Sequence, residues 1–200
     1  MKRSPLVHER VFAGGFAAEY ARKHRKIAEK FGREVAEKLT LRDFEGARIL
    51  DVGCGFGATA IVLAKALPRS ELVGIDLSDP LLELAIGAAQ DASLGGRVTF
   101  EKADVQQIPY GDNSFDAVIN VQMLHIVEDP VAMLDEMERV LTPAGLLFMA
   151  DIRRSWVGLF DQVFRSALTV EEADALVRRS RLRQGAFSSD ILWWRCETWG

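Results

Sequence analysis

The chain has 200 residues, of which 48% are hydrophobic and 27% charged, and its formal net charge is −4. These values are typical of an ordinary globular protein that can bury a core within one domain. No apolar run approaches the roughly twenty residues of a membrane-spanning helix. The N-terminal sequence MKRSPLVHER lacks the apolar region of a signal peptide, so a cytosolic location is expected by default.

Charge and cysteine content narrow the set of partners. Residues 1–48 carry a charge balance of +5, residues 49–150 of −10 and residues 151–200 of +1. An acidic body suits a cationic ligand, and it makes a nucleic-acid partner unlikely unless the basic N-terminal residues supply the contacts. Cys54 and Cys196 are too few for a disulfide framework or a metal cluster, so both are expected as thiols and no metal site is expected.

The N-terminal segment is predicted to be helical. Aromatic and aliphatic residues recur there at three- or four-residue steps between residues 9 and 39. Gly14 and Gly15 interrupt the first part, so we expect two helices that separate near these glycines or near Tyr20. The basic run RKHRK at residues 22–26 is interpreted as a solvated helix face.

A buried strand that enters a glycine-rich turn is predicted at Ile49 to Gly57, ILDVGCGFG. Strong helix formers follow from Ala58 to Leu67, and a second apolar strand then ends in Asp76. Such a unit of about thirty residues binds a nucleotide across the carboxyl ends of its strands. Glycines allow the backbone to approach the ligand, and an acidic residue at the second strand can accept hydrogen bonds from the ribose hydroxyls.

The glycine spacing indicates the kind of nucleoside. The dinucleotide fingerprint is G-x-G-x-x-G, whereas Gly53, Gly55 and Gly57 follow G-x-G-x-G, and Asp51 lies two residues before the first glycine. A carboxylate there would repel a pyrophosphate but suit a ligand with an amino group and a sulfonium. The stretch therefore resembles motif I of the class I S-adenosylmethionine-dependent methyltransferases, and NAD is disfavoured.

Three further segments resemble the same family in the correct order. They are FEKADVQQI at residues 100–108, FDAVINVQMLHIV at 115–127 and LDEMERVLTPAGLLFMA at 134–150, which are similar to the family's third strand, its fourth strand with the following turn, and the helix and strand after it. The resemblance covers roughly residues 10–152. It is closest to the branch that includes the ubiquinone and menaquinone biosynthesis methyltransferases and many small-molecule enzymes.

The resemblance implies the fold class and the division of the chain. We expect an α/β protein with a Rossmann-like, seven-stranded, mostly parallel sheet, helices on both faces, an antiparallel last strand and an N-terminal helical cap. Residues 1–200 would form a single domain, with an N-terminal arm over the site at 1–45 and the cofactor-binding core at 46–152. A short cap segment and a helix with two strands would follow at 153–200.

The resemblance also implies S-adenosyl-L-methionine as the cofactor and a set of binding residues near the strand ends. They are Asp51, Gly53, Cys54, Gly55, Gly57, Asp76, Leu77, Asp104, Val105, Asn120 and Tyr20. In the family an aspartate at the place of Asp104 binds the adenine amino group, although Asp104 could instead cap the next turn. Asn120 lacks the following Pro-Pro-aromatic run of enzymes that methylate flipped nucleic-acid bases, which disfavours that chemistry.

The C-terminal part is predicted from caps and turns. Asp129 and Pro130 open a helix, and residues 143–145 turn into a strand at Leu146 to Ala150. Trp156 to Phe164 has helical spacing and lies where the family places substrate-covering helices. Thr169 and Glu172 form a capping box for another helix. Two last strands, at residues 186–191 and 192–198, are expected with a turn near residues 188–190.

The predicted reaction is methyl transfer to a small-molecule acceptor whose nucleophile, O, N or C, the sequence leaves open. His125, just after the fourth strand, is the best-placed general base. His8 or His24 could serve instead, or His125 could be packed on a helix with no chemical role. Tyr20 is a candidate to reach the cofactor's methionine end or the acceptor, or it packs on the body. The alternative function is an S-adenosylmethionine-binding protein with a regulatory or non-methyl-transfer role. A monomer or homodimer is expected.

Overall fold

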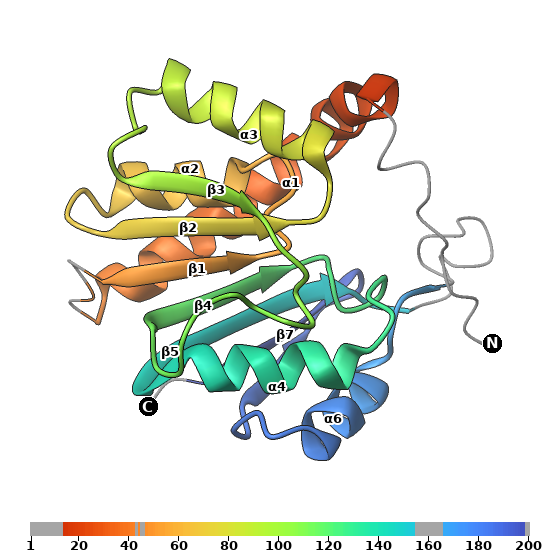
Figure 1. Cartoon of the computed structure of the whole chain (residues 1–200). Helices are drawn as coiled ribbons and strands as arrows, with labels where there is room; N and C mark the ends of the chain where they lie inside the picture. The colour runs from red at the N-terminus through yellow and green to blue at the C-terminus, as the bar shows by residue number, and fades with distance from the viewer. Residues whose placement is uncertain (1–13, 43, 45–46, 155–165, 199–200) are drawn as a thin grey trace.

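The computed structural model describes residues 14–42, 44, 47–154 and 166–198, and its centre is a single sheet (Figure 1). The strands are β1 Arg48–Val52, β2 Glu71–Asp76, β3 Val98–Lys102, β4 Phe115–Val121, β5 Leu141–Ile152, β6 Ala186–Ser189 and β7 Trp193–Thr198. They form one seven-stranded sheet in the order β3-β2-β1-β4-β5-β7-β6. Strands β1 to β5 are parallel, and β7 is antiparallel to both β5 and β6. The predicted fold class is confirmed.

Helices cover both faces of the sheet (Figure 1). They are α1 Gly14–Thr40, α2 Ala58–Ala66, α3 Asp79–Asp91, α4 Pro130–Val140 and α6 Val170–Arg179. Apolar residues of α1, α2 and α3 pack with Ile49 on one face, and those of α4 and α6 pack with Leu50 and Val52 on the other. Because β1 is buried on both faces, it carries apolar side chains toward both of them, Ile49 toward one face and Leu50 and Val52 toward the other.

Helix α1 is one continuous helix from Gly14 to Thr40, so a break near Tyr20 is a wrong prediction. The residues before Gly14 lie outside the described part of the chain. Two different contacts keep the helix intact on either side of Tyr20. Ala17, before Tyr20, and Ala21, after it, are buried and pack with residues of the glycine turn and of α3. Further along, Phe31 and its neighbours are buried against the sheet.

The second half of α1 is fixed to the last strand of the chain. The guanidinium Nε of Arg195 on β7 lies 2.6 Å from the carboxylate of Glu34 on α1, and Lys38 Nζ lies 2.9 Å from Glu197. The rings of Phe31 and Trp193 meet edge to face with centroids 5.1 Å apart. The second half of α1 therefore belongs to the core, and the division of the chain into an arm at 1–45 and a cofactor-binding core at 46–152 stays a prediction.

The capping predictions for the C-terminal part hold, but the turn between the last two strands lies at residues 190–192 and not near 188–190, because Ser188 and Ser189 pair with β7. Asp129 accepts hydrogen bonds from the backbone at the start of α4, and Thr169 and Glu172 form the expected capping box of α6. Strand β5 begins earlier than predicted, at Leu141, and its pairing with β4 is interrupted until Leu146. The segment Trp156 to Phe164 lies outside the described residues.

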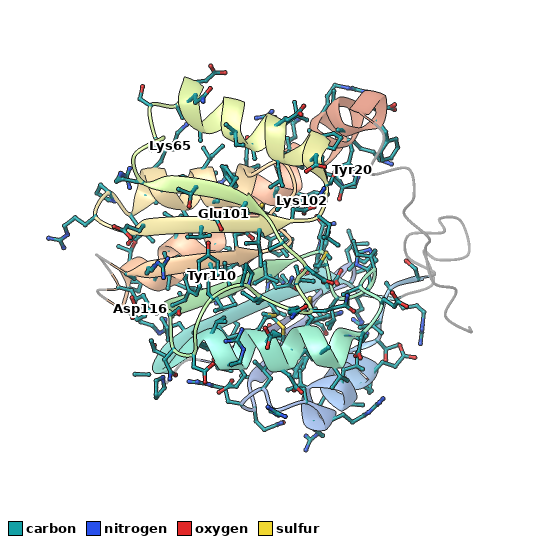
Figure 2. All side chains as sticks on the ribbon, viewed as in Figure 1. Tyr20, Lys65, Glu101, Lys102, Tyr110 and Asp116 are labelled. Atoms are coloured by element: carbon teal, nitrogen blue, oxygen red, sulfur yellow. The ribbon has the colours of Figure 1, made fainter. Side chains whose placement is uncertain are left out.

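The loop between β3 and β4 is attached through Tyr110 to the last part of β3 and to Arg48 at the amino end of β1. The hydroxyl of Tyr110 donates to Glu101 at 2.6 Å, and the guanidinium of Arg48 lies 5.3 Å from the Tyr110 ring. Figure 2 shows Tyr110 and Asp116 toward this end and Tyr20 at the carboxyl end of the strands.

None of the helices in the described ranges combines the length and the apolar character that crossing a membrane requires. The cytosolic location expected from the sequence stays a prediction.

Candidate functional site

The glycine turn after β1 has a backbone that favours glycine. Gly53, Gly55 and Gly57 have φ angles of 74°, 51° and 74°, in the left-handed region. A Cβ on Gly53 would lie 2.9 Å from the Met123 side chain, and one on Gly57 would lie 2.6 Å from the Phe100 ring. The turn therefore has to be built of bare backbone, which leaves room above it for a ligand.

Asp76 holds this turn at the end of β2. Its two carboxylate oxygens accept hydrogen bonds from the backbone N–H groups of Gly55 and Ser78, both at 2.9 Å. Each oxygen keeps a further lone pair for a ligand. Burial raises the pKa of Asp76, while the backbone N–H groups of Ser78, Gly55 and Leu77 act in the opposite direction.

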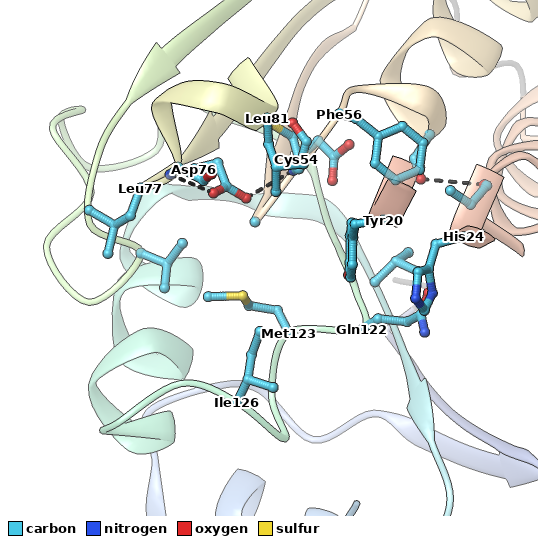
Figure 3. A pocket seen from close by; sticks show the side chains of 18 residues that line it. Tyr20, His24, Cys54, Phe56, Asp76, Leu77, Leu81, Gln122, Met123 and Ile126 are labelled. Atoms are coloured by element: carbon cyan, nitrogen blue, oxygen red, sulfur yellow. Dashed lines mark hydrogen bonds between the residues drawn. The ribbon is translucent and has the colours of Figure 1, made fainter. Parts of the chain in front are cut away.

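A first pocket opens at the carboxyl ends of the strands (Figure 3). The glycine turn and the end of β2 form one side, and helix α1 forms another with Tyr20 and His24. Of the predicted binding residues, the ones that line this pocket are Tyr20, Asp51, Gly53, Cys54, Gly55, Asp76, Leu77 and Val105. The structure thus brings together most of the set that the sequence indicated.

Asp51 is the most unusual group of the first pocket. Its side chain is only 2% exposed, and Oδ2 has no hydrogen-bond partner among the described residues. Burial, and then the nearby charge of Asp76, raise the pKa of Asp51 to about 7. Burial also raises the pKa of the Cys54 thiol well above its usual range. A buried acceptor beside a second carboxylate favours a ligand that carries positive charge.

Three predicted residues lie outside the first pocket. Gly57 is the N-cap of α2. Asn120 is fully buried, and its Nδ2 donates to the carbonyl of Val52 at 2.8 Å. Asp104 accepts a hydrogen bond from the backbone of Gln106 at 2.9 Å, which is the turn-capping alternative. A contact of Asp104 or Asn120 with a cofactor stays a prediction.

A second pocket adjoins the first. Its wall consists of Phe16, Glu19, Tyr20, Lys23, His24, Gln122, His125 and Ile126. The two pockets share Tyr20, His24, Gln122 and Ile126. A molecule in the second pocket would therefore lie beside a molecule in the first.

His125 on this wall is held by a buried carboxylate. The Nδ1 atom lies 2.7 Å from Oδ1 of Asp151, and the backbone N–H of His125 donates to Oδ2 of Asp151 at 3.0 Å. Because an ionised carboxylate can only accept, Nδ1 of a neutral His125 carries the proton and Nε2 is the basic nitrogen. Asp151 thus sets the tautomer of a histidine that lines the second pocket.

Tyr20 and His24 stack between the two pockets, with ring centroids 4.3 Å apart. Burial, then the charges of Asp76 and Asp151, raise the pKa of Tyr20 to about 12, so its hydroxyl keeps its proton at neutral pH. Burial, then the charge of Lys23, lower the pKa of His24. Both rings are therefore uncharged at pH 7 where they line the two pockets.

Several site residues were missed from the sequence. Asp151 directly follows a predicted strand, just as Asp76 does, and the same rule about strand ends would have pointed to it. Gln122 and Met123 carry no local signal of their own. Within the described residues, no group of three or more histidine, cysteine or carboxylate side chains is placed to ligate a metal ion.

A mostly parallel sheet with a glycine turn and buried carboxylates at its carboxyl edge defines a nucleoside-binding α/β protein. The family model of the methyltransferase domain matches residues 43–186, so the chain belongs to this family. The resemblance to class I S-adenosylmethionine-dependent methyltransferases is confirmed.

Individual relatives agree with this family. The chain is 40% identical over 117 residues to 27-O-demethylrifamycin SV methyltransferase of Amycolatopsis mediterranei, covering 58% of this chain and 42% of the relative. It is 35% identical over 135 residues to demethylmenaquinone methyltransferase of Staphylococcus aureus, covering 66% and 55%. The chain thus spans about half the length of the curated relatives it matches.

A solved structure shows the same fold. It is a SAM-dependent methyltransferase from Aquifex aeolicus with a TM-score of 0.71 and 22% identity, covering 81% of this chain and 87% of that one.

Proposed function

We propose that this protein transfers a methyl group from S-adenosyl-L-methionine to a hydroxyl group of a small molecule. The observation that carries the proposal is the His125–Asp151 pair on the wall of a pocket that adjoins the nucleoside pocket. The name of the rifamycin relative points to an oxygen acceptor in that protein. The −10 charge balance of residues 49–150 supports a small molecule over a nucleic acid.

The residues of the first pocket fit the cofactor. Asp76 would accept hydrogen bonds from the ribose hydroxyls with its remaining lone pairs. Oδ2 of Asp51, buried without a partner among the described residues, would accept from the cationic amino group of the methionine moiety. The bare backbone of Gly53 and Gly55 allows the ligand to approach closely.

The reaction divides between the cofactor and the protein. When bound, S-adenosyl-L-methionine would supply a methyl group on a positively charged sulfur: the carbon–sulfur bond would break with its electron pair staying on sulfur, and a carbon–oxygen bond would form to the acceptor. His125 Nε2 takes the hydroxyl proton, and Asp151 stabilises the imidazolium that results. Tyr20, His24 and Ile126 keep water from the junction of the two pockets.

The test is a methyl-transfer screen. The protein is incubated with S-adenosylmethionine and a panel of small hydroxyl compounds, and S-adenosylhomocysteine and the methyl ether are measured by mass spectrometry. We expect paired formation of both products, and we expect the His125→Ala variant to lose it. Binding of S-adenosylmethionine without transfer to any acceptor in the panel or in a metabolite extract would favour the alternative of a binding protein. Tight NADH binding with no response to the methionine compounds would reject both functions.

A further inference from the structure

Gln122, the residue directly after β4, has an unfavourable backbone conformation. Its φ angle is 61°, in the left-handed region that favours glycine. The other described non-glycine residues with positive φ are Ser93 and Asn113, and neither lines the first or the second pocket. A long side chain has thus been placed at a strained position within the site.

The surroundings impose this conformation on Gln122. Its backbone N–H donates to the carbonyl of Ala150 on β5 at 2.8 Å. The next residue begins a turn, in which the carbonyl of Met123 accepts from Ile126 at 3.0 Å. Met123 in turn packs over Gly53 of the glycine turn. Glycine would satisfy the same contacts with less strain, so the structure retains a glutamine side chain at a cost to stability.

The side chain lies where the two pockets meet. Gln122 lines both pockets, on the same side as Tyr20 and His24 (Figure 3). It is half-buried, and its amide forms no hydrogen bond with any residue of the described ranges. In Asn120, two residues earlier, the amide nitrogen already donates to the carbonyl of Val52. The Gln122 amide therefore has both a donor and an acceptor available to a ligand.

His125 lies three residues beyond Gln122, at the other end of the same turn, and lines the same second pocket. An acceptor that places a hydroxyl at His125 would thus present its neighbouring atoms to Gln122. We propose that Gln122 is a specificity residue whose amide binds an oxygen next to the reacting hydroxyl of the acceptor. This inference rests on the proposed function and narrows it to acceptors with two adjacent oxygens, such as 1,2-diols, catechols or ortho-hydroxy carbonyl compounds.

The test compares two probes that differ by one oxygen. Binding of catechol and of phenol to the complex with S-adenosylhomocysteine is measured by NMR titration. We expect the wild type to prefer catechol by about fivefold or more, because phenol leaves the amide without its partner. In Gln122→Leu, which keeps the length and the strain but removes the amide, we expect the preference to disappear. Gln122→Asn, which keeps an amide and tolerates positive φ, should retain part of it.

The melting temperature, measured beside the preference for catechol, distinguishes a role of Gln122 in specificity from a role in folding. Gln122→Gly should raise the melting temperature by about 2–8 °C while the preference for catechol is lost. Ser93→Gly is the matched control: Ser93 has a φ of 57° and lies outside both pockets, so it should gain stability and keep the preference. Affinity for S-adenosylhomocysteine should stay unchanged in Ser93→Gly, and it is measured in the Gln122 variants as well because Gln122 also lines the first pocket.

Three results would overturn the inference. They are equal or undetectable binding of the two probes to the wild type, a preference that persists in Gln122→Leu, and a loss of S-adenosylhomocysteine affinity in that variant, which would assign Gln122 to the cofactor. A failure of the proposed function is distinguishable from these. It would appear as an absence of methyl transfer in a protein that still prefers catechol through Gln122.

Discussion

The imidazole of His125, in the turn after β4, and the carboxylate of Asp151, at the end of the adjacent strand β5, form a buried pair with Nδ1 and Oδ1 2.7 Å apart. This pair predicts a steep loss of turnover when the histidine is removed. His125→Ala should lower kcat by about 10²–10⁴-fold, since a positioned base contributes about that much. Its affinity for S-adenosylhomocysteine should stay unchanged, because His125 does not line the first pocket. Release of S-adenosylhomocysteine, measured with an acceptor from the screen, gives kcat.

Glu128→Gln is the control for this change, because Glu128 is exposed in the loop that follows. It should retain wild-type turnover. Full turnover in His125→Ala would show that the acceptor needs no base or that another residue supplies it.

The buried carboxyl of Asp51 predicts that cofactor binding depends on pH. Because its pKa is raised to about 7 in the free protein, Asp51 is mostly protonated at pH 5.5 and mostly ionised at pH 7.5. A cationic ligand favours the ionised form, so its affinity should rise by about tenfold over this interval and binding should release a proton. Calorimetric titration with S-adenosylmethionine in two buffers of different ionisation enthalpy measures both quantities.

Stability of the free protein should change in the opposite direction. Between the unperturbed value of 3.8 and about 7 the folded state holds a proton that the unfolded state has lost. The contribution of Asp51 to the free energy of unfolding is therefore present at low pH and is lost as pH rises through 7. Asp51→Asn should reduce the pH dependence of both affinity and stability. An unchanged affinity profile in this variant would assign the proton to another group.

Asp76→Ala should weaken cofactor binding by about 1–3 kcal/mol, because charge-assisted hydrogen bonds to the ribose are lost. Part of the loss would come from the glycine turn, since Asp76 also accepts the N–H of Gly55. Asp79→Ala is the matched control: Asp79 is close in sequence, but its side chain is 61% exposed and pairs with Lys102. Equal affinities of the two variants in calorimetry would show that the ribose binds elsewhere.

The glycines of the turn should respond differently to the same added methyl group. Gly57→Ala should lower the free energy of unfolding by about 2–4 kcal/mol, because strain at positive φ adds to a clash with Phe100. Gly55→Ala should cost only about 1–2 kcal/mol, since the nearest side-chain atom is 3.9 Å away and only the strain remains. Urea unfolding of both variants measures the difference. Comparable losses would contradict the geometry of the turn.

Gly87→Ala is the control for these variants. Gly87 lies within α3 and has no atom within 4 Å of an added Cβ, so this variant should gain about 0.5–1 kcal/mol from helix propensity.

The sequence predicted the parts of the site that depend on short stretches of chain. The glycine turn and the position of Asp76 could be predicted because neighbouring residues specify the strands and turns around them. The predicted sheet is present. The partnership of Asp151 with His125 was missed because the residues are 26 positions apart and meet only when β4 and β5 pair. The continuity of α1 was missed for a similar reason, since its second half is held by the distant strand β7.

The ion pairs between α1 and β7 have a consequence for biosynthesis. During translation α1 leaves the ribosome before any strand of the sheet, but Arg195 lies 161 residues after Glu34, and Glu197 lies 159 residues after Lys38. The helix that carries Tyr20 can therefore dock fully only after β7 has been synthesised. A nascent chain would already have its glycine turn while still lacking a completed binding wall, which delays the capacity to bind ligand until β7 has left the ribosome.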